Sequence, residues 1–123
     1  MQIGVDIIEI RRIGNLLDKY PNFRCRVFTD GEIAYCENKS HPDQHDAARF
    51  AAKESIIKAF GSTGARNLHW KDLEIVVNPL GEPLVQLHGE IKVAADELGI
   101  KGVAVSLSHC KEYAVAIAQV ISG

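Results

Sequence analysis

The segment of residues 49–61, RFAAKESIIKAFG, places four charged side chains in an otherwise apolar helix, and no other stretch constrains the fold as strongly. One face of this helix carries an apolar stripe with the spacing i, i+4, i+7 and i+8. Glu54 and Lys58 lie on nearly the opposite side, where apolar residues flank them as well. We therefore expect the helix to be buried on most sides. The stripe consists of Ala48, Ala52, Ile56, Ala59 and Phe60, and the flanking residues are Ala47, Phe50 and Ile57.

The acid and the base one turn apart on this helix have two interpretations. Glu54 and Lys58 can form a plain i,i+4 ion pair on a solvated face, and taken alone their spacing favours this simple pair. Among apolar neighbours, however, the same two charges are costly to desolvate without further partners. A metal ion or an anionic ligand would supply such partners.

The length and composition of the chain set limits on its class. The 123 residues suit one domain, spanning 1–123, with a single core. A formal net charge of −2 gives no electrostatic footprint for nucleic acid. Three cysteines without metal-ligand spacing, and no signal peptide, predict reduced thiols in a cytoplasmic protein without zinc. No apolar run is long enough to span a bilayer, so no membrane partner is expected.

Residues 2–10, QIGVDIIEI, are rich in Ile and Val and predict a strand. Because side chains alternate along a strand, Asp6 shares a largely apolar face with Gly4, Ile8 and Ile10. This acid lies either at an edge where the face meets solvent or beside a functional partner. The strand alone favours neither alternative.

Local signals predict the remaining elements. Their order of strand, helices, hairpin, helix and hairpin predicts an α+β fold with an antiparallel sheet. The sequence of residues 62–67 does not match the pattern of a phosphate-binding P-loop, because no Gly-Lys-Ser/Thr sequence follows. Four helices are expected: residues 11–20, which Pro21 stops; a two-turn segment that begins with a Thr29/Glu32 capping box; residues 42–60, which Gly61 caps; and residues 90–98. Two hairpins are expected, one that pairs 73–77 with 84–87 and one that pairs 103–109 with 113–120.

The N-terminal third is locally basic and interleaves aromatic and basic side chains. An acidic protein partner would suit this surface, and the alternative is a set of solvated arginines whose stems cover the core. The residues are Arg11, Arg12, Phe23, Arg24, Arg26 and Phe28.

His109 lies where the first strand of the last hairpin ends, next to Cys110. A Cys/His dyad is disfavoured, because neighbours on a strand point to opposite faces. His109 is then a rim residue, a phosphate donor or a general base. Ser106 and Ser108 are expected to face solvent or a neighbouring subunit.

Three segments occur together in a specific order and spacing: IGVDIIEIRRI with Asp6, RFAAKESIIKAFG, and VSLSHCKEYAVA. The chain thereby resembles the holo-acyl-carrier-protein synthases, the short bacterial type of 4'-phosphopantetheinyl transferase, from about residue 2 to its C-terminus. The G-x-D and F-x-x-K-E-x-x-x-K-A motifs are specific in combination. The NPLGEP turn is also similar to the hairpin connection of that family.

The resemblance implies Mg²⁺-dependent transfer of the phosphopantetheine arm of coenzyme A to a serine of acyl carrier protein, releasing 3',5'-ADP, in fatty acid synthesis. Asp6 and Glu54 match the metal-binding positions, whose hard carboxylate oxygens suit Mg²⁺. Lys58 would contact the pyrophosphate, and Arg49 and Lys53 other phosphate oxygens. The resemblance thus assigns catalysis to Asp6, Glu54, Lys58 and His109, and coenzyme A binding to Arg49, Lys53, Lys58, Gly61 and His109.

The same resemblance implies a homotrimer with coenzyme A sites between subunits, which would account for the second apolar face of the central helix. An acidic carrier protein would dock near the N-terminus at positions matched by Arg12, Leu16, Phe23 and Arg26. Cys110 is a departure, because the family often has Ser or Asp there, and the sequence does not identify the base that takes the serine proton.

Two other functions remain open. The first is a non-catalytic trimer that binds coenzyme A or a nucleotide, although the retention of both metal acids counts against it. The second is an acyltransferase that depends on Cys110.

Overall fold

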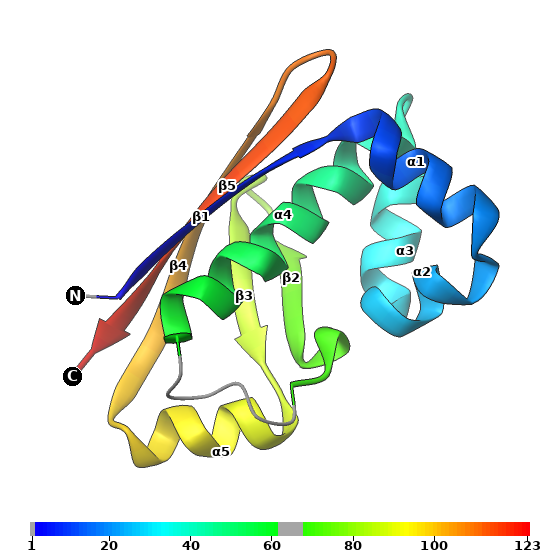
Figure 1. Ribbon diagram of the computed structural model, residues 1–123. Helices are drawn as coiled ribbons and strands as arrows, with labels where there is room; N and C mark the ends of the chain where they lie inside the picture. Colours follow the sequence, from blue (N-terminus) through cyan, green and yellow to red (C-terminus); the bar gives the residue numbers. More distant parts are fainter. Residues whose placement is uncertain (1, 62–67) are drawn as a thin grey trace.

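The computed structural model describes residues 2–61 and 68–123, and in it one long helix lies across a three-stranded antiparallel sheet (Figure 1). The sheet has the order β1-β5-β4, so the first strand of the chain pairs with the last. Two further strands, β2 and β3, form a separate antiparallel hairpin. The predicted α+β fold with antiparallel pairing is confirmed, with the strands divided between two sheets. The strands are β1 (Ile3–Glu9), β2 (Leu73–Val77), β3 (Pro83–Leu87), β4 (Ile100–His109) and β5 (Tyr113–Ser122).

The helices begin and end close to the predicted positions, and one was not predicted. Pro21 ends α1, as expected, but it also begins α2. Proline fits the first turn of a helix, because the backbone N–H groups there have no acceptor within the helix and its lack of an N–H costs no hydrogen bond. The predicted capping box is confirmed: Thr29 Oγ1 accepts from Glu32 N at 3.2 Å, and Thr29 N donates to Glu32 Oε1 at 2.8 Å. The helices are α1 (Ile10–Lys19), α2 (Pro21–Val27), α3 (Asp30–Glu37), α4 (Pro42–Phe60) and α5 (Gly89–Glu97), with a 3₁₀ turn, η2 (Trp70–Asp72).

Helix α4 is the predicted central helix, and its apolar stripe is buried throughout. It ends at Gly61, whose φ of 60° lies in the left-handed region that glycine adopts without strain. The segment of residues 62–67, considered above for phosphate binding, lies outside the described residues. Within the described ranges, no helix is long and apolar enough to cross a membrane.

Strand β1 approaches α4 very closely at Gly4. A Cβ placed on Gly4 would overlap the carbonyl oxygen of Ser55 and lie 2.7 Å from the amide nitrogen of Ala59. Only glycine therefore permits this spacing, and it brings Asp6, two residues further along β1, against the C-terminal half of α4.

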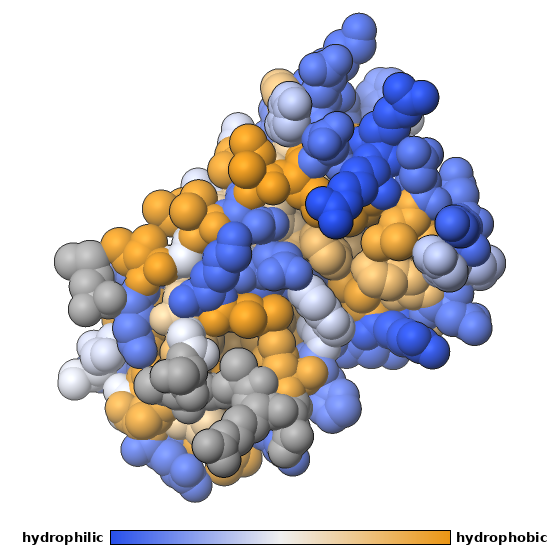
Figure 2. All heavy atoms as spheres, viewed as in Figure 1, coloured by the Kyte–Doolittle hydropathy of each residue, from blue (hydrophilic) through white to orange (hydrophobic). Residues whose placement is uncertain are grey.

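The other face of the sheet, turned away from α4, is largely apolar and exposed. Figure 2 shows its edge as an apolar band along β1, beside hydrophilic side chains over the C-terminal half of α4. No described part of the chain covers these side chains, which are 45–65% exposed. They are Ile3, Val5, Ile7, Tyr113, Ile117 and Ile121.

Candidate active site

The first cluster of predicted site residues lies between β1 and the C-terminal half of α4. Lys58 Nζ donates to Asp6 Oδ1 at 3.0 Å and to the carbonyl oxygen of Val5 at 3.1 Å. The Asp6 side chain is only 16% exposed, whereas that of Lys58 is 52% exposed. The ammonium group is therefore accessible to a ligand while it touches the acid.

Glu54 completes this cluster. Burial raises the pKa of its carboxyl group, the negative charge of Asp6 raises the pKa further, and Lys58 lowers it. The carboxyl groups of Asp6 and Glu54 therefore act on each other through space, as expected for residues that share a site. The simple ion pair between Glu54 and Lys58 is absent from the described residues, since Lys58 pairs with Asp6 instead.

The donor set suits Mg²⁺ better than a metal held by protein alone. Within residues 2–61 and 68–123, no group of three or more His, Cys, Asp or Glu side chains is arranged to hold a metal ion. Mg²⁺ commonly uses one or two carboxylates and completes its octahedron with water and substrate phosphates. Asp6 and Glu54 fit that pattern, and a divalent cation between them would relieve their mutual repulsion.

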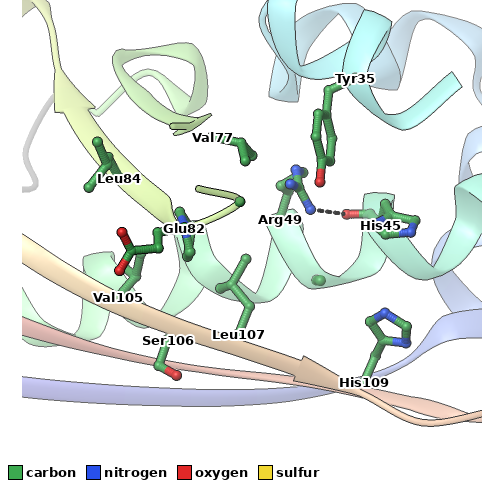
Figure 3. A pocket seen from close by; sticks show the side chains of 13 residues that line it. Tyr35, His45, Arg49, Val77, Glu82, Leu84, Val105, Ser106, Leu107 and His109 are labelled. Carbon is green, nitrogen blue, oxygen red and sulfur yellow. Dashed lines mark hydrogen bonds between the residues drawn. The ribbon is translucent and has the colours of Figure 1, made fainter. Parts of the chain in front are cut away.

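A second cluster surrounds Arg49 in a pocket of about 440 Å³ between α4, the β2–β3 hairpin and β4 (Figure 3). The Arg49 side chain is only 4% exposed, and its guanidinium lies over the ring of Tyr35 at 4.3 Å. Its Nη1 donates weakly to the carbonyl oxygen of His45 at 3.4 Å. Its Nε has no hydrogen-bond partner among the described residues, which is unusual for a buried polar atom.

His109 belongs to this second cluster. Its ring meets the ring of His45 edge-on, with centroids 5.5 Å apart, at the end of β4. His45 was missed by the sequence analysis, although it lies one helical turn before Arg49 and thus on the same flank of α4. Burial lowers the pKa of His45, and the positive charges of Arg49, His109 and Lys39 lower it further.

The side chains of the two clusters project from opposite flanks of α4. Arg49 and Lys58 are nine residues apart, which is about two and a half helical turns. Lys58 faces β1 and Arg49 faces the pocket beside β4, and β5 separates these two strands. Within one chain, therefore, Arg49 and His109 are not brought together with Asp6, Glu54 and Lys58.

Lys53 does not lie where a phosphate ligand would reach it. Its ammonium is fully buried and donates to Glu32 Oε1 at 2.7 Å, to the carbonyl oxygen of Val27 at 2.8 Å and to that of Trp70 at 3.0 Å. All three donor sites of an ammonium group are thus used. Since its ammonium is fully buried and bonded to other elements, Lys53 holds α4 to its neighbours instead of reaching a ligand, contrary to the expectation from sequence. Burial also lowers the pKa of Lys53.

The residues predicted to dock a carrier protein lie together near α1 and α2. Leu16, Phe23 and Arg26 line one shallow depression, and the exposed Arg12 precedes Leu16 by one turn of α1. Figure 2 shows apolar surface between α1 and α2, bordered by hydrophilic side chains.

Cys110 is exposed and makes no side-chain hydrogen bond to His109 in the described part of the chain. Backbone hydrogen bonds at Glu112 and Tyr113 lower its pKa. Ser106 and Ser108 are exposed, as expected.

Comparisons with known proteins agree over almost the whole chain. The family model of the 4'-phosphopantetheinyl transferase superfamily matches residues 2–118. A holo-[acyl-carrier-protein] synthase of Caldanaerobacter subterraneus subsp. tengcongensis is 42% identical over 121 residues, covering 98% of this chain and 94% of that protein. The crystal structure of holo-ACP-synthase from Plasmodium yoelii is similar with a TM-score of 0.84 at 33% identity, covering 99% of this chain and 94% of that one. A Helicobacter pylori holo-[acyl-carrier-protein] synthase in complex with coenzyme A has a TM-score of 0.83 at 30% identity, covering 96% and 98%.

Proposed function

The chain belongs to the 4'-phosphopantetheinyl transferase superfamily, and we propose that it transfers the 4'-phosphopantetheine group of coenzyme A to a serine of apo acyl carrier protein. The observation that supports this proposal is the contact of the accessible Lys58 ammonium with Asp6, whose charge also acts on Glu54. We place the reaction in fatty acid synthesis in the cytoplasm, which agrees with the three free cysteines.

The reaction exchanges one phosphorus–oxygen bond for another. The serine Oγ of the carrier protein forms a bond to the phosphorus that bears pantetheine, and the bond from that phosphorus to the bridging oxygen breaks. The electron pair of the broken bond stays with the bridging oxygen, so 3',5'-ADP leaves with additional negative charge, and the serine proton passes to a base. Lys58, whose side chain is 52% exposed, would stabilise that developing charge.

Asp6 and Glu54 would hold Mg²⁺, which when bound supplies positive charge to the pyrophosphate and lowers the pKa of a bound water. Glu54 must be deprotonated to serve as a ligand, and a nearby cation favours its charged form against the effects of burial and of Asp6. Lys58 neutralises Asp6 before the ligand arrives and remains exposed enough to contact a phosphate oxygen.

Mass spectrometry of an apo carrier protein incubated with coenzyme A and Mg²⁺ tests the proposal directly. A mass gain of one phosphopantetheine is expected with the wild type. No such gain is expected after chelation with EDTA, or with the Asp6→Asn and Glu54→Gln variants. If coenzyme A binds but no mass is gained, the chain is the non-catalytic coenzyme A-binding protein considered above. A Cys110→Ser variant that loses all activity while Glu54→Gln keeps it would instead favour a cysteine-dependent acyltransferase.

The division of the site between two flanks of α4 supports an oligomer with shared active sites. A head-to-tail ring joins different surfaces of neighbouring copies, so the Lys58 flank of one copy can meet the Arg49 flank of the next. The uncovered apolar face of the sheet is the kind of surface that such contacts bury. We propose a homotrimer in which a neighbouring copy supplies Arg49 and His109 to the acids of the first.

Mixing inactive subunits tests this arrangement. Glu54→Gln damages one half of a shared site, and His109→Ala damages the other half. Mixed oligomers would contain some sites in which both halves are intact, so partial recovery of activity is expected after subunit exchange. Sedimentation should show a trimer, and no recovery from fully exchanged mixed trimers would contradict a shared site.

The depression between α1 and α2 is the proposed docking surface for the carrier protein. Leu16 and Phe23 offer apolar contacts, and Arg12 and Arg26 add positive charge at its rim. Such a surface suits an acidic partner, and exposed charges of this kind chiefly raise the rate of encounter in a salt-dependent way.

A further inference from the structure

The buried cation of Arg49 lacks the partners that buried charges usually have. Within the described residues it takes part in no ion pair, and its Nε has no hydrogen-bond partner. Asp46, the buried acid on the same helix, is paired with Arg24 at 3.2 Å instead. Because an unpaired buried charge is costly, this environment suits an anionic ligand.

His45 faces the same space as Arg49. Figure 3 shows both side chains on α4, with Tyr35 on one side and His109 on the strand opposite. The His45 ring meets the Tyr35 ring edge-on at 6.0 Å and the His109 ring at 5.5 Å, which orients the imidazole without a hydrogen bond to either. Within the described residues, the ring nitrogens of His45 make no hydrogen bond, so one of them in the neutral imidazole, or both in the protonated form, can donate to a ligand.

The groups around His45 are mostly positive or able to become so. Arg49 lies one turn along α4, His109 ends β4, and Lys39 lies over the Tyr35 ring at 4.5 Å. Glu82 lines the hairpin wall of the pocket, and its Oε1 accepts a hydrogen bond from Asn78 Nδ2 at 3.0 Å. Burial and these positive groups lower the pKa of His45, and a bound dianion would oppose both effects and favour a protonated imidazole.

We propose that His45 acts with Arg49 to bind a phosphate monoester, and that His45 determines the preference for coenzyme A over its form without the 3'-phosphate. This inference rests on the proposed function. The pyrophosphate of coenzyme A is assigned to the Asp6, Glu54 and Lys58 flank, and the ribose monoester is the one phosphate that remains. The hydrogen-bond donors around the buried guanidinium of Arg49 suit the concentrated negative charge of a phosphate monoester.

Calorimetric titration with coenzyme A and with 3'-dephospho-coenzyme A tests the proposal without turnover. His45→Phe keeps an aromatic ring against Tyr35 and His109 but removes both ring nitrogens. The affinity for coenzyme A should fall about 10- to 100-fold, the range for a lost hydrogen bond to a charged group, while that for dephospho-coenzyme A stays nearly constant. The amide of His45→Gln can donate a hydrogen bond but cannot gain a proton. The affinity of this variant for coenzyme A should therefore lie between those of the wild type and His45→Phe.

His88→Phe is the matched control, because His88 is half exposed, pairs with Glu74 and lies outside the pocket. Its ratio of affinities for the two ligands should equal that of the wild type. An unchanged ratio in folded His45→Phe, or equal losses for both ligands, would overturn the proposal.

The experiment distinguishes failure of the His45 proposal from failure of the proposed transferase function. A changed ratio in a protein that transfers nothing supports the His45 site and removes the transferase assignment. Normal transfer with an unchanged ratio of affinities would support the transferase assignment and overturn the His45 site. If coenzyme A did not bind at all, both proposals would be overturned.

Discussion

Replacing Gly4 by alanine should lower both the activity and the stability, because Gly4 sets the distance between β1 and α4. A Cβ at this position would lie 2.7 Å from Ala59 N and closer still to the carbonyl oxygen of Ser55. Ordinary contacts of this kind lie at about 3.5 Å, so the strand and the helix must separate by more than about 1 Å to relieve the closer of the two contacts. Overpacking of this sort costs about 1–3 kcal/mol in the free energy of unfolding.

The same displacement moves Asp6 relative to Glu54 and Lys58, because Asp6 is carried by β1 and the other two by α4. A misplacement of about 1 Å in a catalytic arrangement can lower the rate about 100-fold. We therefore expect kcat/KM of Gly4→Ala to fall about 100-fold, mainly through kcat, while the protein remains folded.

Phosphopantetheine transfer followed by mass spectrometry measures the first quantity, and urea unfolding measures the second. Gly102→Ala is the matched control, because a Cβ at Gly102 would meet nothing within 4 Å. Its activity should stay close to that of the wild type. If Gly4→Ala kept the kcat/KM and unfolding midpoint of the wild type, close approach of β1 to α4 would not be what positions the acids.

Three further outcomes can be measured. Lys53→Met should lower the free energy of unfolding by about 3–5 kcal/mol, because it leaves Glu32 buried without its cation, and a loss below about 1 kcal/mol in urea unfolding would contradict this. Iodoacetamide at about pH 8 should label the exposed thiols of the native protein but not Cys36, because burial raises the pKa of Cys36 to about 12; its thiolate fraction rises only as the pH approaches that value, so mass spectrometry showing Cys36 labelled in folded protein would refute the assignment. Arg12→Glu should raise KM for the carrier protein more than KM for coenzyme A, most clearly at low salt, whereas equal increases would count against the docking surface.

Local sequence signals predicted the elements of the fold well. The Thr29/Glu32 capping box forms as expected, and Gly61 ends α4 with the positive φ that favours glycine. These signals work because each depends on residues within a few positions of one another. The sequence did not predict α2, because Pro21 indicates the end of one helix but equally suits the first turn of the next.

The partners of the charged side chains on α4 depended on distant segments, so they could not be read from the helix alone. Lys53 was expected to reach phosphate, but Glu32 and the carbonyl oxygens of Val27 and Trp70 surround its ammonium. Nothing in the local pattern distinguishes it from Lys58, whose acidic partner lies on β1. The separation of Arg49 from Lys58, in contrast, follows from their spacing of nine residues and was available in the sequence.

The same contacts that fix the orientation of α4 therefore also build both halves of the candidate site. Lys53 holds one flank of the helix against α3 and η2, and Gly4 admits the helix backbone to β1 on the sheet side. A slip of α4 by one residue would turn it by about 100°, which would direct Glu54 and Lys58 away from Asp6. Any substitution that repacks α4 should therefore change stability and transfer together. Substitutions at His45, which lines the pocket, should instead act mainly on the affinity for coenzyme A.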